Sequence, residues 1–235
     1  MPESSTSERR RRLVRALVIC VAAIAAAPAT AAACTTSTNN GQIFIKGLNV
    51  VPADHAYGNQ HDVTIHGGTL SCNVGEWAKV GTVHNGLGPN WLVEIGYLLR
   101  KDSSGGTYAT LFTEKQTPSG TAANVIASIH PAIGSVWSMK AVPASATSYA
   151  LYAEVAGSGW GAPWVTYTGL PRDWIQPRGE TERFGTGTGR DTRTSMYWRN
   201  SAGAWSLDWN PAISVGSMPG YHFTRTSNSS YTISL

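Results

Sequence analysis

Trp-Leu-Val-Glu-Ile-Gly-Tyr-Leu-Leu-Arg, residues 91–100, is the stretch that decides the fold. It is rich in β-branched and aromatic residues and lies between turn-forming segments at 88–90 and 103–106, so we expect a strand. Side chains alternate between the two faces of a strand, and here both faces are apolar enough for burial. The stretch therefore predicts a central strand. Glu94 is the exception, because it places a lone carboxyl beside Gly96 on one of these faces.

Short strand-like segments continue along the rest of the chain, separated by Gly, Pro, Ser and Asn. No segment keeps helical periodicity over three turns. This pattern predicts an antiparallel all-β sandwich or barrel formed by residues 42–235, after a loose polar leader at 34–41. The expected strands are 42–51, 63–65, 69–72, 77–83, 91–99, 107–114, 125–129, 136–142, 149–155, 164–168, 173–182, 194–198, 205–208, 221–226 and 231–235.

Residues 1–33 have the composition of a secretory signal peptide. Arg9–Arg12 precede an apolar segment at 13–27, and small residues ending in an Ala-x-Ala pattern follow it. A transmembrane anchor is the alternative, but the apolar segment is short for a span, which needs roughly 20 residues. We therefore expect cleavage near Ala31 or Ala33, secretion, and no stable membrane association afterwards.

Two cysteines remain after that cleavage, Cys34 and Cys72. An even count in an exported chain favours a disulfide between them. A lipid-modified Cys34 is less favoured, because position 31 holds alanine where such sites usually carry leucine. Without residues 1–33 the chain has 13 basic and 12 acidic residues. No basic block remains, so we expect no nucleic-acid surface. We also expect a monomer.

Glu94 and Glu180 are the residues most suited to catalysis. A carboxylate inside an apolar strand is paired, protonated, solvent-facing or functional, because an isolated buried charge is costly. Glu180 follows Gly179, which permits close backbone approach. Two carboxyls brought together cannot both ionise easily, so one acts as acid while the other acts as base on water. This chemistry needs no metal or cofactor. For Glu94 the alternatives are exposure to solvent or pairing with Arg178 or Lys140, and for Glu180 the rival is Glu182.

The motifs Trp-Leu-Val-Glu-Ile-Gly-Tyr at 91–97 and Arg-Gly-Glu at 178–180, with a hydrophobic strand at 136–142, resemble the neprosin family of glutamic peptidases. The strand pattern also resembles uncharacterised exported actinobacterial β-sandwich proteins. The resemblance implies a β-sandwich of jelly-roll or concanavalin-like shape, with Glu94 and Glu180 as the two catalytic glutamates. It implies a secreted endopeptidase that acts at acid pH on peptides, and we expect Tyr97 to contribute to substrate binding.

The alternative is a non-catalytic β-sandwich that binds a glycan or a surface partner. Trp160 and Trp164 lie in a Gly/Pro-rich loop, where exposed rings could stack on sugars or on apolar side chains. They could equally cover the edge of the core. His55, His61 and His66 lie in or near a loop-rich segment whose spacing matches no zinc motif, so we expect solvated side chains there and no metal.

Overall fold

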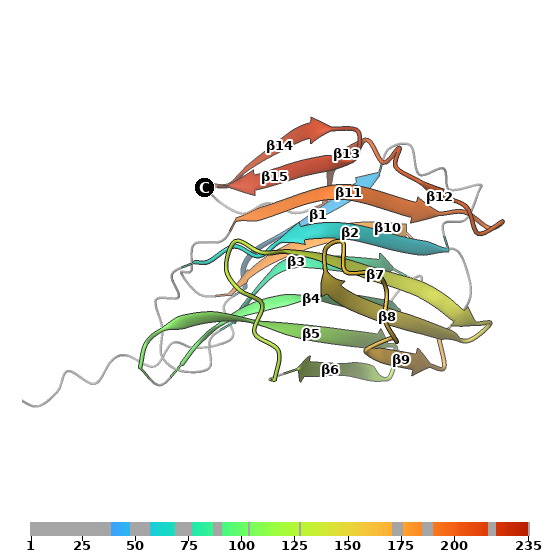
Figure 1. Cartoon of the computed structure of the whole chain (residues 1–235), viewed down its shortest axis with the longest axis horizontal. Helices are drawn as coiled ribbons and strands as arrows, with labels where there is room; N and C mark the ends of the chain where they lie inside the picture. The colour runs from blue at the N-terminus through green and yellow to red at the C-terminus, as the bar shows by residue number, and fades with distance from the viewer. Residues whose placement is uncertain are drawn as a thin grey trace, which may run out of the picture. The chain divides into compact units, whose positions relative to one another are not determined.

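Two antiparallel sheets make up the computed structural model (Figure 1). It describes residues 39–47, 57–68, 77–86, 91–102, 104–126, 128–170, 176–184, 190–215 and 220–234, all in one compact unit. The first sheet has the order β13-β1-β10-β3-β4-β5-β6. Its strands are β13 (Pro211–Val215), β1 (Asn39–Gly47), β10 (Gln176–Phe184), β3 (Trp77–Gly86), β4 (Leu92–Lys101), β5 (Thr107–Thr117) and β6 (Gly120–Ile126).

The second sheet has the order β14-β15-β11-β2-β7-β8-β9, with the short β12 paired to β11. Figure 1 shows its strands running in nearly the same direction as those of the first sheet. The strands are β14 (His222–Ser227), β15 (Ser230–Ser234), β11 (Asp191–Arg199), β12 (Trp205–Ser206), β2 (Gly58–Thr64), β7 (Val136–Ser145), β8 (Ser148–Val155) and β9 (Val165–Thr168).

The hydrophobic core lies between the two sheets. β4 contacts β7 and β8 of the second sheet, and β3 contacts β2 and β7. Alternate residues of these strands supply the buried side chains, as expected where one face of each sheet covers the other. The largest apolar or aromatic side chains of this core with almost no exposure are Trp209, Tyr97, Tyr149, Tyr231, Ile45, Ile65, Ile95, Leu99, Leu111 and Met139. The predicted all-β antiparallel sandwich is confirmed.

β4 is a central strand, as its sequence predicts. It pairs along its length with both β3 and β5. Its residues from Val93 to Leu99 are all buried. Val93, Ile95 and Leu99 belong to the core between the sheets. The other face, which carries Glu94 and Gly96, therefore points away from the second sheet.

Three strands differ clearly from the sequence-based expectation, and the strand expected at 69–72 lies outside the described residues. β6 covers Gly120–Ile126, where a strand was expected at 125–129. β2 begins at Gly58, inside a segment expected to be a loop, because its inward positions hold polar residues, Asn59 and His61, both fully buried. β13 was not expected at all, since it starts at Pro211 and pairs only with β1. Proline is tolerated on such an edge strand, where no ladder hydrogen bond is lost.

Within the residues that the structure describes, no helix is long and apolar enough to cross a membrane. The predicted signal peptide at 1–33, the leader up to position 38, and both Cys34 and Cys72 lie outside the described residues. Secretion and the disulfide therefore stay predictions.

Candidate functional site

Glu94 is on β4 and Glu180 is on β10, and one strand separates these two. That strand is β3, which pairs with β4 on one side and with β10 on the other. His84 of β3 is opposite Glu94 and also opposite Arg178. Two residues further along β10, Glu180 is opposite Thr82 of β3. Adjacent strands are about 4.8 Å apart, so positions 94 and 180 are separated by roughly 10 Å of sheet width.

Positions 94 and 180 lie on the same face of the first sheet. One row across the sheet joins Ile45, Gly179, Val83 and Ile95. Ile45 and Ile95 are fully buried in the core between the sheets, so this row faces inward. Neighbouring positions on each strand face the opposite way. Positions 84, 94, 178 and 180 therefore share the outward side, which we call the Glu94 face.

A β-bulge lies between the two glutamate strands. The register of β3 and β4 shifts between the pairs Val80–Tyr97 and Val83–Ile95. As a result Gly81 and Thr82 together are opposite Gly96. Bulges of this kind are common beside active sites, where they redirect a side chain. Here the bulge lies at Thr82, the position opposite Glu180, and on the other side of β4 the buried Phe112 of β5 is opposite Gly96.

Glu114 is a third carboxyl on the Glu94 face, and the sequence reasoning missed it. It lies on β5 directly opposite Glu94. Opposed residues of an antiparallel pair have Cβ atoms about 4.5–5.5 Å apart. Glu94 is fully buried and Glu114 is 9% exposed. The sequence contains a signal for this pairing. If the β4–β5 hairpin is paired outward from the turn at 102–106, residue 114 is aligned with residue 94.

The burial of Glu94 removes two of the alternatives for this residue. The side chain is fully buried, so it does not face solvent. Lys140 lies on β7 of the second sheet, paired with Gln60 and Tyr152, so it is not a neighbour of Glu94. Arg178 remains in the same row as Glu94, with His84 between them. Glu182 is opposite Gln42 of β1, beyond the last described pair of β10 with β3, which favours Glu180.

Tyr97, which was expected to contribute to substrate binding, does not lie on the Glu94 face. It is fully buried in the core, three residues from Glu94 and therefore on the opposite side of the strand. Its hydroxyl accepts a hydrogen bond from the backbone N–H of His66 at 3.0 Å. Burial raises the pKa of Tyr97 above its ordinary value. The phenol is thus a structural side chain that joins β4 to the second sheet.

Trp160 and Trp164 also lie away from Glu94. Trp164 packs against the core and donates its indole N–H to the carbonyl of Ala153 on β8. Trp160 is 38% exposed and covers the Lys140 ammonium, with 3.7 Å from Nζ to the ring centroid. Exposure is therefore found for Trp160 and not for Trp164. Neither ring lines the Glu94 face, because both belong to the side of the second sheet.

His61 and His66 are not the solvated loop residues expected from the sequence. His61 is fully buried on β2, and His66 is half-buried with Nε2 at 3.0 Å from the Thr192 hydroxyl. His55 lies outside the described residues. In the described ranges no three His, Cys, Asp or Glu side chains are grouped so that they could hold a metal ion.

His61 belongs to a buried polar network between the sheets. Arg193 donates from Nη1 to Nδ1 of His61 at 2.9 Å and from Nε to Asp191 at 3.0 Å. Arg193 and Asp191 are fully buried, and the Tyr231 hydroxyl donates to Asp191 at 3.1 Å. A guanidinium cannot accept a hydrogen bond, so Nδ1 of His61 is unprotonated. Burial, and then the charge of Arg193, hold the pKa of His61 well below its ordinary value.

His61 should therefore make the fold less stable as the pH falls. The unfolded chain takes up a proton at an ordinary pKa of about 6.5, whereas the folded chain does so only at a lower pH. The stability that neutral His61 provides is complete above about pH 6.5 and is lost toward the folded pKa, by up to about 1.4 kcal/mol per pH unit. We expect His61→Gln to flatten the fall in unfolding free energy between pH 7 and pH 5, measured by urea titration. His222→Gln, on exposed β14, is the control. An unchanged slope in His61→Gln would contradict this reading.

Comparison with known proteins supports a glutamic peptidase fold. No family model matches the chain, and no curated protein matches it in sequence. Solved structures do match it. Scytalido-glutamic peptidase with a peptide-based transition-state analogue aligns with a TM-score of 0.55 and 12% identity, over 83% of this chain and 98% of that one. The same peptidase with a transition-state analogue inhibitor aligns at 0.56 and 10%, over 85% and 99%.

A further match is SCP-B, a member of the eqolisin family of peptidases, in complex with the tripeptide Ala-Ile-His. It has a TM-score of 0.53 and 10% identity, over 83% of this chain and 98% of that chain. This chain shares their fold. At 10–12% identity the likeness concerns the fold alone. The β-sandwich fold that the resemblance implies is thus one that this chain shares with solved glutamic peptidases, and the link to neprosin itself stays a prediction.

Proposed function

We propose that this chain is a secreted glutamic-type endopeptidase whose catalytic carboxyls are Glu94 and Glu180. The observation that supports this best is the register that assigns both positions to one face, separated by the single strand β3. A span of roughly 10 Å leaves room for a water molecule and a peptide group between two carboxyls. The solved peptidases of the same fold carry peptide-like ligands, which supports a peptide as the substrate.

The proposed chemistry is activation of water by one carboxylate and protonation of the leaving amine by the other carboxylic acid. The base must reach its water directly and the acid must reach the scissile nitrogen. Glu114, opposite Glu94, adds a second carboxyl beside it. Close carboxyls favour sharing a proton, so ionisation of the whole group is unfavourable. Positions 84 and 178, which hold a histidine and an arginine, lie in the same row as Glu94.

Substrate binding has to open the Glu94 face. Glu94 is fully buried in this structure, so bulk water does not reach its carboxyl. Hydrolysis therefore requires that the peptide, on binding, displaces whatever covers this face and admits a single ordered water. We propose this exclusion of bulk water as a condition of the working site.

Peptide cleavage should be confined to acid pH. We expect the purified full chain to cleave a denatured protein between about pH 3 and pH 5, with cleavage lost by pH 7, because one of the paired carboxyls must hold a proton. Mass spectrometry of the products after digestion at pH 3–7 measures this. Glu154→Gln, which removes a carboxylate of β8 in the second sheet, should leave the profile unchanged. Undiminished cleavage at pH 7, or no cleavage at any pH, would contradict the proposal.

Glycan binding through the tryptophans has less support. Of the two rings considered for it, Trp160 remains partly exposed, and its face already covers the Lys140 ammonium. Trp164 is occupied with the core and with Ala153. Trp160 and Trp164 therefore do not present two exposed rings on which a sugar could stack.

A further inference from the structure

A pocket of about 350 Å³ lies at one end of the second sheet, on a different sheet from the Glu94 face. It lies beyond the start of β2 at Gly58, where the neighbouring strand β7 continues. On one side β7 extends to Ser145, and on the other side β11 leads into a turn after Arg199. The space beyond the start of β2 is therefore not filled by a strand. The pocket is lined by Tyr57, Pro143, Ala144, Ser145, Ala146, Arg199, Asn200, Ser201, Ala202 and Gly203.

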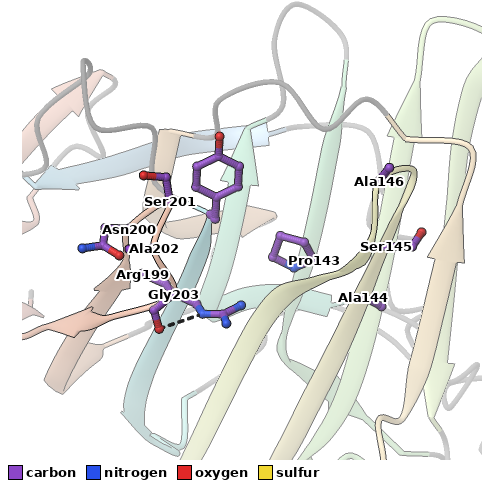
Figure 2. A pocket seen from close by; sticks show the side chains of 10 residues that line it. Pro143, Ala144, Ser145, Ala146, Arg199, Asn200, Ser201, Ala202 and Gly203 are labelled. Atoms are coloured by element: carbon purple, nitrogen blue, oxygen red, sulfur yellow. Dashed lines mark hydrogen bonds between the residues drawn. The ribbon is translucent and has the colours of Figure 1, made fainter.

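The guanidinium of Arg199 is the charged group of this pocket. Figure 2 shows it extending from β11 toward Pro143. Its Nε donates to the carbonyl of Gly203 at 3.2 Å, which fixes the plane of the group. Arg199 is half-buried, and among the described residues no carboxylate pairs with it. Its Nη donors therefore remain available toward the pocket.

The backbone under Arg199 is packed so that the guanidinium keeps this place. Gly58 is opposite Arg199 in the sheet. A Cβ at Gly58 would lie 2.9 Å from Cγ1 of Val142 and 3.2 Å from Cβ of Arg199. The backbone N–H of Tyr57 also donates to the carbonyl of Arg199 at 2.6 Å. The sheet thus holds the backbone of Arg199, and the turn that contains Gly203 holds its guanidinium.

We infer that this pocket binds the carboxylate group of a small ligand or of a peptide C-terminus. A guanidinium presents two parallel N–H donors, a geometry that matches a carboxylate in a bidentate pair. The lining residues Tyr57 and Ser201 each carry a hydroxyl group, a type that can hydrogen-bond the rest of such a ligand. The Ser145 hydroxyl already contacts the Ser148 hydroxyl at 2.6 Å and accepts from the Thr147 N–H at 3.2 Å.

A monoanion fits this pocket better than a phosphate group. Arg199 is the one cation among its lining residues. Lys140 is near enough to interact electrostatically with Arg199, but its ammonium is covered by the Trp160 and Tyr152 rings, 3.7 Å and 4.4 Å from their centroids. Glu154 also offsets the charge of Lys140. The single positive charge of Arg199 would therefore neutralise a carboxylate but only half of the charge of a dianion.

The test is an NMR titration of the ¹⁵N-labelled full chain with N-acetylglycine, at constant ionic strength. We expect saturable shifts of the Arg199 Nε–H and of the Gly203 and Ser145 amides. N-acetylglycinamide, which lacks the charge, should shift these signals at least tenfold less at equal concentration. Arg199→Met should weaken binding of N-acetylglycine at least tenfold, and Arg199→Lys should weaken it by a smaller factor, since an ammonium cannot form the bidentate pair. Arg225→Met, which removes an exposed arginine of β14, should bind as the unmodified chain does.

Three results would overturn the inference. The first is equal binding of N-acetylglycine and its amide. The second is unchanged binding in Arg199→Met with the remaining amide spectrum preserved. The third is tighter binding of inorganic phosphate than of N-acetylglycine, which would assign the pocket to a different class of anion. Because the pocket and the Glu94 face lie on different sheets, Glu94→Gln should bind the probe normally whether or not the chain is a peptidase.

Discussion

Glu94→Gln should lower kcat/KM for peptide cleavage at pH 4 by at least about 100-fold. A positioned general acid or base contributes roughly 10²–10⁴-fold, and glutamine keeps the size of the side chain while it can neither take up nor release the catalytic proton. A steady-state assay with a fluorogenic peptide measures the loss. If Glu94 serves only as a buried strand residue, the substitution should change stability and leave the activity of the folded protein intact.

Two comparisons separate catalysis from folding in this experiment. The urea midpoint of Glu94→Gln shows how much folded protein is present in the assay. Glu154→Gln removes a carboxylate of similar size from the second sheet and should keep the activity of the unmodified chain. Activity of Glu94→Gln within about threefold of the unmodified chain, with both proteins folded, would remove Glu94 from the mechanism.

Asp191→Asn should lower the free energy of unfolding by about 3–5 kcal/mol. The substitution leaves the Arg193 guanidinium in the core without the carboxylate at 3.0 Å, and both side chains are fully buried. Removing one partner of a buried ion pair costs this much because the remaining charge is uncompensated. Burial disfavours the charged form of Arg193, and Asp191 reverses this effect, so that the pKa of Arg193 is raised. Urea unfolding at pH 7 measures the loss.

Arg193→Met is the complementary change and should cost a similar amount. Because the two residues interact directly, the double variant Asp191→Asn/Arg193→Met should lose clearly less than the sum of the single losses. Arg190→Met removes an exposed arginine next to the pair and should stay within about 0.5 kcal/mol of the unmodified chain. Additive losses in the double variant would show that the pair is not coupled.

Strong apolar alternation made most of the fold predictable. β4, β5, β7 and β8 were expected from runs of β-branched and aromatic residues, and each of them pairs with a strand on both sides. β2 was missed at its start because Asn59 and His61 are polar yet face the core. Their burial is made possible by partners that are distant in sequence, such as Arg193 for His61 at 2.9 Å. Local pattern carries no information about such partners.

The candidate site was predictable in part for the same reason. Glu94 stood out because it interrupts an apolar strand, and alternation predicted that Gly96 shares its face. The strand order that puts β3 between β4 and β10 depends on contacts between residues almost 100 positions apart. Tyr97 was assigned to the substrate by its motif, although alternation already placed it on the face opposite Glu94. Glu114 required the register of the hairpin, which the turn length determines.

The central claim is that Glu94 and Glu180 act as one catalytic unit, and the single measurement that tests it is kcat/KM at pH 4 for Glu94→Gln, Glu180→Gln and the double variant. Residues that act together lose nearly all of their effect when either is removed. We therefore predict that each single variant loses at least about 100-fold and that the double variant is no more than about tenfold worse than either. Full activity in Glu180→Gln, or losses that multiply in the double variant, would contradict the account.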